Sequence, residues 1–183
     1  MLGRAEWNEP EGNAVETNEI LIEVFGRVAE HVHNAVDGLD AEQLATAPVP
    51  GSNPIGWLVW HLTRVEDAHI AELLEADQVW TTGDVAARFG VDADPANSGY
   101  GHTPEQVAAI RPDGPGALLD YFEAVSARTR SYLEGVTATD LDRIVDERWD
   151  PPVTLGVRLV SIADDEVQHG GQANYARGML LGG

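Results

Sequence analysis

The sequence contains no cysteine and no lysine, and these two absences remove several kinds of chemistry. Without cysteine, the chain can form neither a disulfide nor a thiolate metal site, and it has no cysteine nucleophile. Without lysine, it cannot form a Schiff base, anchor pyridoxal phosphate or complete a P-loop. A metal site in this protein must therefore take its ligands from histidine, aspartate and glutamate.

Positive charge is scarce. The 11 basic residues, all arginine, stand against 31 acidic residues, which gives a formal net charge of −20 at pH 7. Such a charge repels phosphate backbones and anionic membrane surfaces, so we expect neither nucleic acid nor a membrane as partner. The first residues lack the apolar segment of a secretory signal, and no apolar run approaches the roughly 18 residues of a membrane span. These features predict a soluble, cytoplasmic protein.

Four long stretches have the spacing of apolar residues that is typical of amphipathic helices. They cover residues 15–39, 54–76, 116–136 and 154–181. No convincing alternating strand pattern lies between them, so the sequence predicts an all-α protein built as a four-helix bundle. The length suits one well-filled core, and we expect residues 1–183 to form a single domain whose first 13 residues are a loose tail.

A long connection separates the second and third predicted helices. It spans about 38 residues, far more than a tight turn needs, and insertions of this size in compact domains are often functional. We expect this loop to cover one end of the bundle. Within it, Thr103 followed by Gln106 forms a capping box, which predicts a short helix at that point.

Three polar residues interrupt the apolar faces of the second and fourth helices. His61 lies at the edge of one face, and Asp165 and His169 lie one turn apart on the other. Burying such groups without partners costs at least about 1–3 kcal/mol, so they normally acquire some. Two histidines and a carboxylate form an ordinary site for a divalent metal whose shell is completed by water. Alternatively, Asp165 and His169 form only a hydrogen-bonded pair, with His61 at a helix edge.

A second metal arrangement competes for the same helices. Two Glu-x-x-His motifs, Glu66 to His69 and Glu166 to His169, match the motif that di-iron carboxylate bundles use twice. Such bundles take one further glutamate from each of the other two helices. The candidates for these positions are Glu23, Glu30 and Glu123.

Three more residues are candidates for substrate binding. Arg158 precedes Asp165 on the same helix face and could neutralise a substrate carboxylate, although an arginine beside an acid in so acidic a chain more often forms a salt bridge. Tyr100 and His102, in the long loop, could reach a metal-bound water or a substrate. His102 could also serve only to precede the capped helix at Thr103.

Three segments together resemble the DinB-like superfamily, in particular its uncharacterised branch near the N-terminal domain of mycothiol-dependent maleylpyruvate isomerase. They read LDAEQLATAPVPGSNPIGWLVWHLTRVEDAHI, GYGHTPEQVAAI and ERWDPPVTLGVRLVSIADDEVQHGGQANYARGML. The resemblance implies a bundle of up-down-down-up order with a divalent metal bound by His61, Asp165 and His169. Relatives commonly carry histidine where this chain has Asp165, and the isomerase branch carries an acid there.

The resemblance also implies a function. Relatives of known chemistry use such a metal to activate a low-molecular-weight thiol, so we expect a thiol-dependent transferase or isomerase with a small-molecule substrate. Zinc suits this ligand set best, with nickel or iron as alternatives. The rival interpretation is a non-catalytic, metal-stabilised binding or assembly module. The strongly apolar helix at 54–76 further predicts a homodimer that hides leftover apolar surface.

Overall fold

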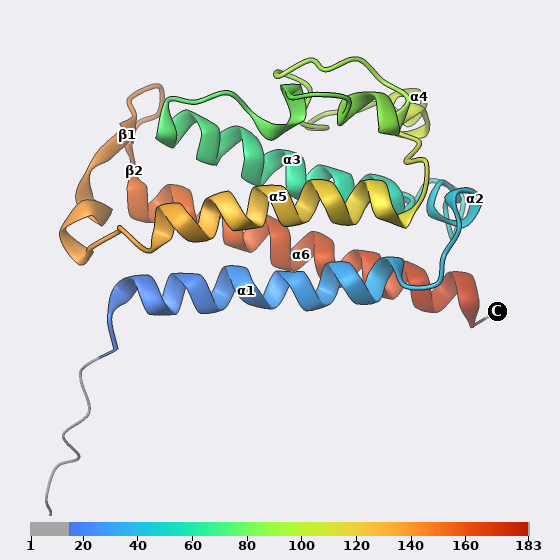
Figure 1. The fold of residues 1–183 in the computed structure, drawn as a ribbon, viewed down its shortest axis with the longest axis horizontal. Coiled ribbons are helices and arrows are strands. Elements are labelled where there is room, and N and C mark those ends of the chain that lie inside the picture. The colour runs from blue at the N-terminus through green and yellow to red at the C-terminus, as the bar shows by residue number, and fades with distance from the viewer. Residues whose placement is uncertain (1–14, 183) are drawn as a thin grey trace, which may run out of the picture.

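The computed structural model describes residues 15–182, so the predicted tail at residues 1–13 lies outside the described residues. The described chain is mostly helical, which confirms the all-α class (Figure 1). Its α-helices are α1 (Thr17–Val36), α2 (Ala41–Leu44), α3 (Ile55–Leu74), α4 (Pro104–Ala109), α5 (Pro115–Leu133) and α6 (Leu155–Leu181). Three short 3₁₀ helices cover Val79–Thr81, Ala86–Phe89 and Ala138–Asp142. The prediction that residues 1–183 form one domain remains a prediction.

The four long helices α1, α3, α5 and α6 lie side by side, with α3 and α1 each packing against α6 and α5. In Figure 1, α1 and α6 run in one direction while α3 and α5 run in the other, which is the up-down-down-up order. Because α3 and α5 are parallel, the chain must travel the length of the bundle to connect them. The long loop, residues 75–114, therefore extends along α3, and the expectation that it covers one end of the bundle was wrong.

Buried polar side chains of α3 fix this loop. Arg64, fully buried, donates hydrogen bonds to the carbonyl oxygens of Pro95 and Asn97 at 3.1 and 3.0 Å. Asp67, also fully buried, accepts hydrogen bonds from the backbone N–H groups of Val79 and Trp80 at 2.9 and 2.8 Å. The backbone groups of a buried loop need partners, and α3 supplies them here. The loop is thereby held against α3 at the level of the candidate site.

A short hairpin between α5 and α6 was not predicted. Its strands, β1 (Ile144–Asp146) and β2 (Val153–Thr154), pair antiparallel. Strands of two or three residues are too short to show an alternating pattern, so they could not be predicted from the sequence. Thr154 then caps α6 by accepting a hydrogen bond from the N–H of Val157. The hairpin thus stands beside the first turns of α6.

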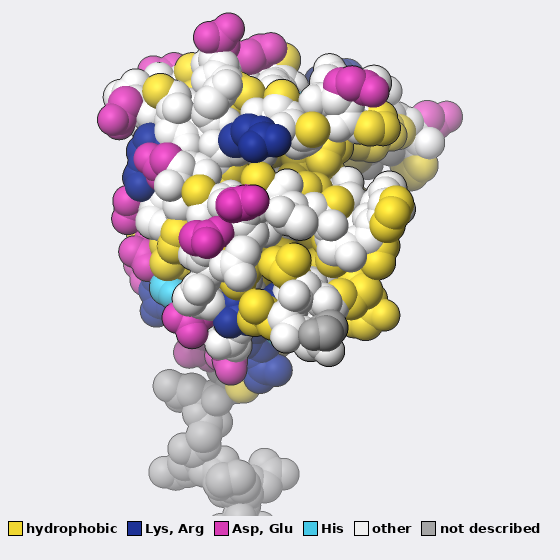
Figure 2. Space-filling view, turned by 90° about the vertical axis from the view of Figure 1, so that its right-hand side faces the viewer, with side chains coloured by type: hydrophobic (Ala, Val, Ile, Leu, Met, Phe, Trp, Pro, Cys, Tyr) yellow, Lys and Arg dark blue, Asp and Glu magenta, His cyan; other side chains and the backbone are white. Residues whose placement is uncertain are grey.

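At one end of the bundle, the acidic side chains are dispersed over the surface (Figure 2). Acidic side chains are spread over the end of the bundle shown in Figure 2, with apolar side chains running between them. Nothing in the described part of the chain is a helix of the length and hydropathy that a membrane crossing requires.

Candidate metal centre

The structure brings His61 of α3 together with Asp165 and His169 of α6. One ligand atom from each lies within 4.8 Å of the others, and residues 15–182 contain no second such group of three. Asp165 Oδ1 is 3.5 Å from His169 Nε2 and 3.9 Å from His61 Nε2. Residues four apart share one face of a helix, and α3 packs directly against that face of α6. The carboxylate therefore lies between two imidazole nitrogens.

One ring nitrogen of His61 is hydrogen-bonded to the backbone, and the other faces Asp165. Its Nδ1 lies 2.6 Å from the carbonyl oxygen of Ser98. Because a carbonyl only accepts, Nδ1 carries the hydrogen and Nε2 keeps its lone pair toward Asp165. The ring also stacks on Trp57, with centroids 4.7 Å apart and planes at 11°. Burial lowers the pKa of His61, which favours the neutral form that binds metals.

The loop can approach His61 this closely because residue 99 is glycine. Gly99 has φ +94°, a conformation that other residues rarely adopt. A Cβ atom placed on it would lie 2.7 Å from His61 Nδ1 and 2.9 Å from the ring of Trp60. The glycine therefore allows the neighbouring Ser98 carbonyl to reach the histidine.

His169 has a similar arrangement. Its Nδ1 lies 3.0 Å from the amide oxygen of Gln172, so its Nε2 is the nitrogen turned toward Asp165. A hydrogen bond that His169 donates to the Asp165 carboxylate raises the pKa of His169. The Asp165–His169 pair of the simpler alternative is thus present. However, the second carboxylate oxygen of Asp165 is buried without a hydrogen-bond partner among the described residues. An unpaired buried carboxylate oxygen is costly, and a cation would satisfy it.

A cavity of about 370 Å³, called the triad cavity below, opens beside these residues. Its walls come from α3, α6 and the long loop. The lining residues are His61, Val65, His69, Ser98, Tyr100, Ser161, Ile162 and Asp165. The cavity can therefore admit a small ligand to the candidate ligand atoms.

The other predicted substrate residues lie in different places. Tyr100 is 94% exposed and stands on the rim of the triad cavity. His102 has both ring nitrogens engaged, one by the indole N–H of Trp57 at 3.2 Å and one by the side-chain oxygen of Asn97 at 2.7 Å. Arg158 lines a neighbouring cavity, where it pairs with Asp146 at 2.8 Å. Arg158 therefore forms a salt bridge, as the alternative interpretation expected, and its partner is Asp146.

The residues of the di-iron alternative do not assemble. Glu66 and Glu166 meet in the core, and burial raises the pKa of both carboxyl groups, which favours the uncharged acid. Their Glu-x-x-His partners diverge, since His169 faces Asp165 whereas His69 contacts Arg158. The glutamates expected from the other two helices are exposed to solvent; they are Glu23, Glu30 and Glu123.

Sequence reasoning missed two contributors to this site. The Ser98 carbonyl is a backbone group, so its role could not be predicted from the pattern of side chains. His69 lines the triad cavity but was considered only as part of the di-iron motif. Gly99, between Ser98 and Tyr100, was the one available signal, because an isolated loop glycine often marks a close backbone approach.

Comparison with known proteins identifies a family and a similar fold. The family model described as mycothiol-S-transferase matches residues 20–182. The fold is similar to the crystal structure of a conserved protein from Enterococcus faecalis, with a TM-score of 0.84 and 32% sequence identity. That similarity covers 93% of this chain and 100% of the other. No curated protein matches the sequence.

Proposed function

Since this chain belongs to the mycothiol-S-transferase family, a DinB-like family, we propose that it joins the thiol of mycothiol to a small electrophile at a single divalent metal. The observation that carries this proposal is the open triad. His61, Asp165 and His169 converge beside a cavity, and no fourth histidine, aspartate or glutamate of residues 15–182 joins them. Catalytic metal sites keep such a position open for a ligand, whereas structural sites close it with protein.

The residues present fit a divalent metal. Each histidine gives its Nδ1 hydrogen to an oxygen and keeps Nε2 for a ligand, as metal-binding histidines usually do. The orphaned oxygen of Asp165 supplies a further donor. Zinc suits two imidazoles and a carboxylate, with nickel or iron as alternatives. A divalent cation bound there would favour the thiolate over the thiol at neutral pH.

The remaining residues of the site position and shield the reacting groups. Trp57 covers one face of the His61 ring and keeps water from it. The Ser98 carbonyl fixes the tautomer of His61, and Arg64 and Asp67 hold the loop that carries it. Tyr100 stands where an incoming substrate would pass, so we retain it as a substrate-binding residue. His102 is assigned to holding the loop in place.

Metal dependence of thiol conjugation tests this function. The purified protein should accelerate the reaction of mycothiol with monochlorobimane, lose that activity on chelation and regain it with zinc. Glutathione in place of mycothiol is the control thiol. Equal rates before and after chelation would contradict the proposal. A bound metal without acceleration of either thiol would favour the alternative, a metal-stabilised binding module.

A further inference from the structure

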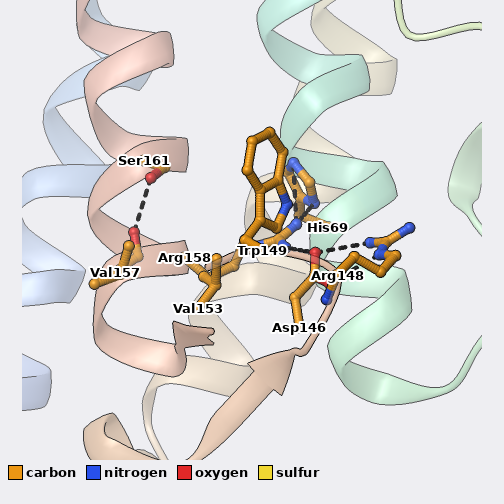
Figure 3. A pocket seen from close by; sticks show the side chains of 8 residues that line it. All are labelled: His69, Asp146, Arg148, Trp149, Val153, Val157, Arg158 and Ser161. Carbon is orange, nitrogen blue, oxygen red and sulfur yellow. Dashed lines mark hydrogen bonds and ion pairs between the residues drawn. The ribbon is translucent and has the colours of Figure 1, made fainter. Parts of the chain in front are cut away.

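A second cavity, of about 510 Å³, lies beside the triad cavity, between α3, α6 and the β1–β2 hairpin. Figure 3 looks into this hairpin cavity and shows Trp149 and His69 between the two helices. His69 and Ser161 line both the hairpin cavity and the triad cavity. A molecule seated in the hairpin cavity would therefore reach the triad past these two side chains.

The walls of the hairpin cavity are mainly apolar. They include Trp149, Val153 and Val157, of which Trp149 is 66% exposed and Val157 54% exposed. The charged groups on its floor are already paired, since Asp146 binds both Arg148 and Arg158 at 2.8 Å. A cavity with apolar walls and few free polar groups suits an apolar or aromatic body.

The opposite side of the triad cavity has a different character. A cavity of about 350 Å³ in the long loop shares Ser98 and Tyr100 with it and is lined by polar side chains including Asp94, Asn97 and Gln106. These groups suit the hydroxyls of a sugar-bearing thiol such as mycothiol. The triad thus has a polar cavity on one side and an apolar cavity on the other. Two such cavities can hold two substrates of different polarity.

His69 lies where the two cavities meet. The guanidinium of Arg158 contacts both ring nitrogens, with Nε2 at 3.4 Å. These contacts hold the ring in place between the two cavities. Asp146 and Glu72 hold the guanidinium in this position.

We propose that the hairpin cavity binds the electrophilic substrate, an aromatic-sized apolar molecule, and that the His69 ring, where the two cavities meet, holds it toward the triad. The proposal rests on the proposed function, because it names the second substrate of the same site. For a chloromethyl electrophile, the sulfur lone pair forms the S–C bond and the C–Cl bond breaks to release chloride. The thiol proton passes to solvent. His69 forms and breaks no bond in this step.

Binding without reaction tests the cavity independently of catalysis. The probe is dimethylbimane, a neutral bicyclic dicarbonyl without a leaving group. Equilibrium dialysis against the metal-free protein measures its binding. Trp149→Ala should weaken binding by about tenfold, because the indole supplies much of the apolar wall. Tyr175→Ala is the matched control, since Tyr175 is an exposed aromatic residue of α6 outside the cavity. Equal binding by wild type and Trp149→Ala would overturn the assignment.

Turnover with two electrophiles then tests the role of His69. Trp149→Ala should raise KM for monochlorobimane by about tenfold and leave the small electrophile chloroacetamide unaffected. His69→Ala should raise KM for monochlorobimane by about threefold with unchanged metal content and an unaffected rate with chloroacetamide, because the ring supplies part of the cavity wall. An unchanged KM in His69→Ala would overturn the role of His69. Dimethylbimane binding that depends on Trp149, in a protein without turnover, would support the cavity and count against the transferase.

Discussion

His61 donates a hydrogen bond from Nδ1 to the Ser98 carbonyl oxygen, and His169 donates one from Nδ1 to the Gln172 amide oxygen. Nε2 of each ring is thereby turned toward Asp165. These contacts are made by groups that would not themselves touch a metal. The candidate centre therefore depends on the fit of the loop as much as on its three ligands.

Gly99→Ala should displace His61 and weaken metal binding by about 10- to 100-fold, because the added Cβ would meet the His61 ring. Competition with a chelator of known affinity measures this effect. Gly101→Ala is the matched control, since Gly101 has a similar φ of +73° but nothing within 4 Å of its Cβ position. Equal metal affinities of the two variants would show that contact with His61 is not important.

Asp165→His should retain metal. The change replaces the carboxylate with a third imidazole and raises the net charge of the site by one unit, so a bound water should become more acidic. Metal analysis of the purified variant measures this directly. A variant that folds but holds no metal would count against Asp165 as a ligand.

The sequence allowed much of this site to be predicted, because His61, Asp165 and His169 interrupt apolar faces at helical spacing. The resemblance then selected them over the Glu-x-x-His motifs. The contact between Arg158 and His69 could not be predicted, because it joins residues 89 positions apart. The paired glutamates Glu66 and Glu166 also belong to the core, which spacing alone could not establish.

At the scale of elements, the four long helices followed from their apolar periodicity, but the path of the long loop did not. That path depends on the parallel arrangement of α3 and α5 and on two buried charges, Arg64 and Asp67. In a helix that otherwise looks apolar, such charges appear only as interruptions. The hairpin was missed because two- and three-residue strands carry no readable pattern.

Asp67→Ala should destabilise the protein by about 3–5 kcal/mol, because it leaves Arg64 buried without its carboxylate and frees the N–H groups of Val79 and Trp80. Urea unfolding measures this loss. The exposed i,i+4 pair of Glu23 and Arg27 provides the control, and Glu23→Ala should cost under about 0.5 kcal/mol. Similar losses of unfolding free energy in the two variants would contradict the role of Asp67 in holding the loop.

The hairpin should lose stability in acid. Hydrogen bonds from Arg148, and then from Arg158, hold the pKa of Asp146 well below its usual value of 3.8. Because the folded pKa is depressed, the carboxylate contributes stability that is fully present above the unfolded pKa and is lost as the pH falls through the folded pKa. The difference in unfolding free energy between wild type and Asp146→Asn should therefore be constant near neutrality and shrink below about pH 4. Urea titrations at several pH values check this, and a constant difference down to pH 2 would contradict it.

At the scale of the whole molecule, the reason given for a homodimer needs correction. The apolar helix α3 is covered by the chain itself, through α5, α6 and the long loop. Exposed apolar side chains instead lie on α1 and α6, including Ile20, Val160 and Val167. A cavity of about 570 Å³ with largely apolar walls lies between Ile20 and Val167. This face is therefore where we expect a second copy to pack.

We predict a homodimer through the α1–α6 face. Since each chain carries a formal charge of −20, association should strengthen as salt screens the repulsion. Light scattering at low and high salt measures the mass, and Val167→Glu should dissociate the dimer. A monomer at every protein concentration and salt would remove this prediction.

Metal stoichiometry of the wild type, His61→Ala, Asp165→Ala and Glu166→Ala tests the central claim most directly. Elemental analysis after purification without added chelator should find one divalent metal per chain in the wild type and in Glu166→Ala, provided that the latter folds by circular dichroism. His61→Ala and Asp165→Ala should be largely empty, because the two remaining ligands cannot hold a labile ion at ordinary buffer concentrations. Full metal content in both His61→Ala and Asp165→Ala would contradict the triad.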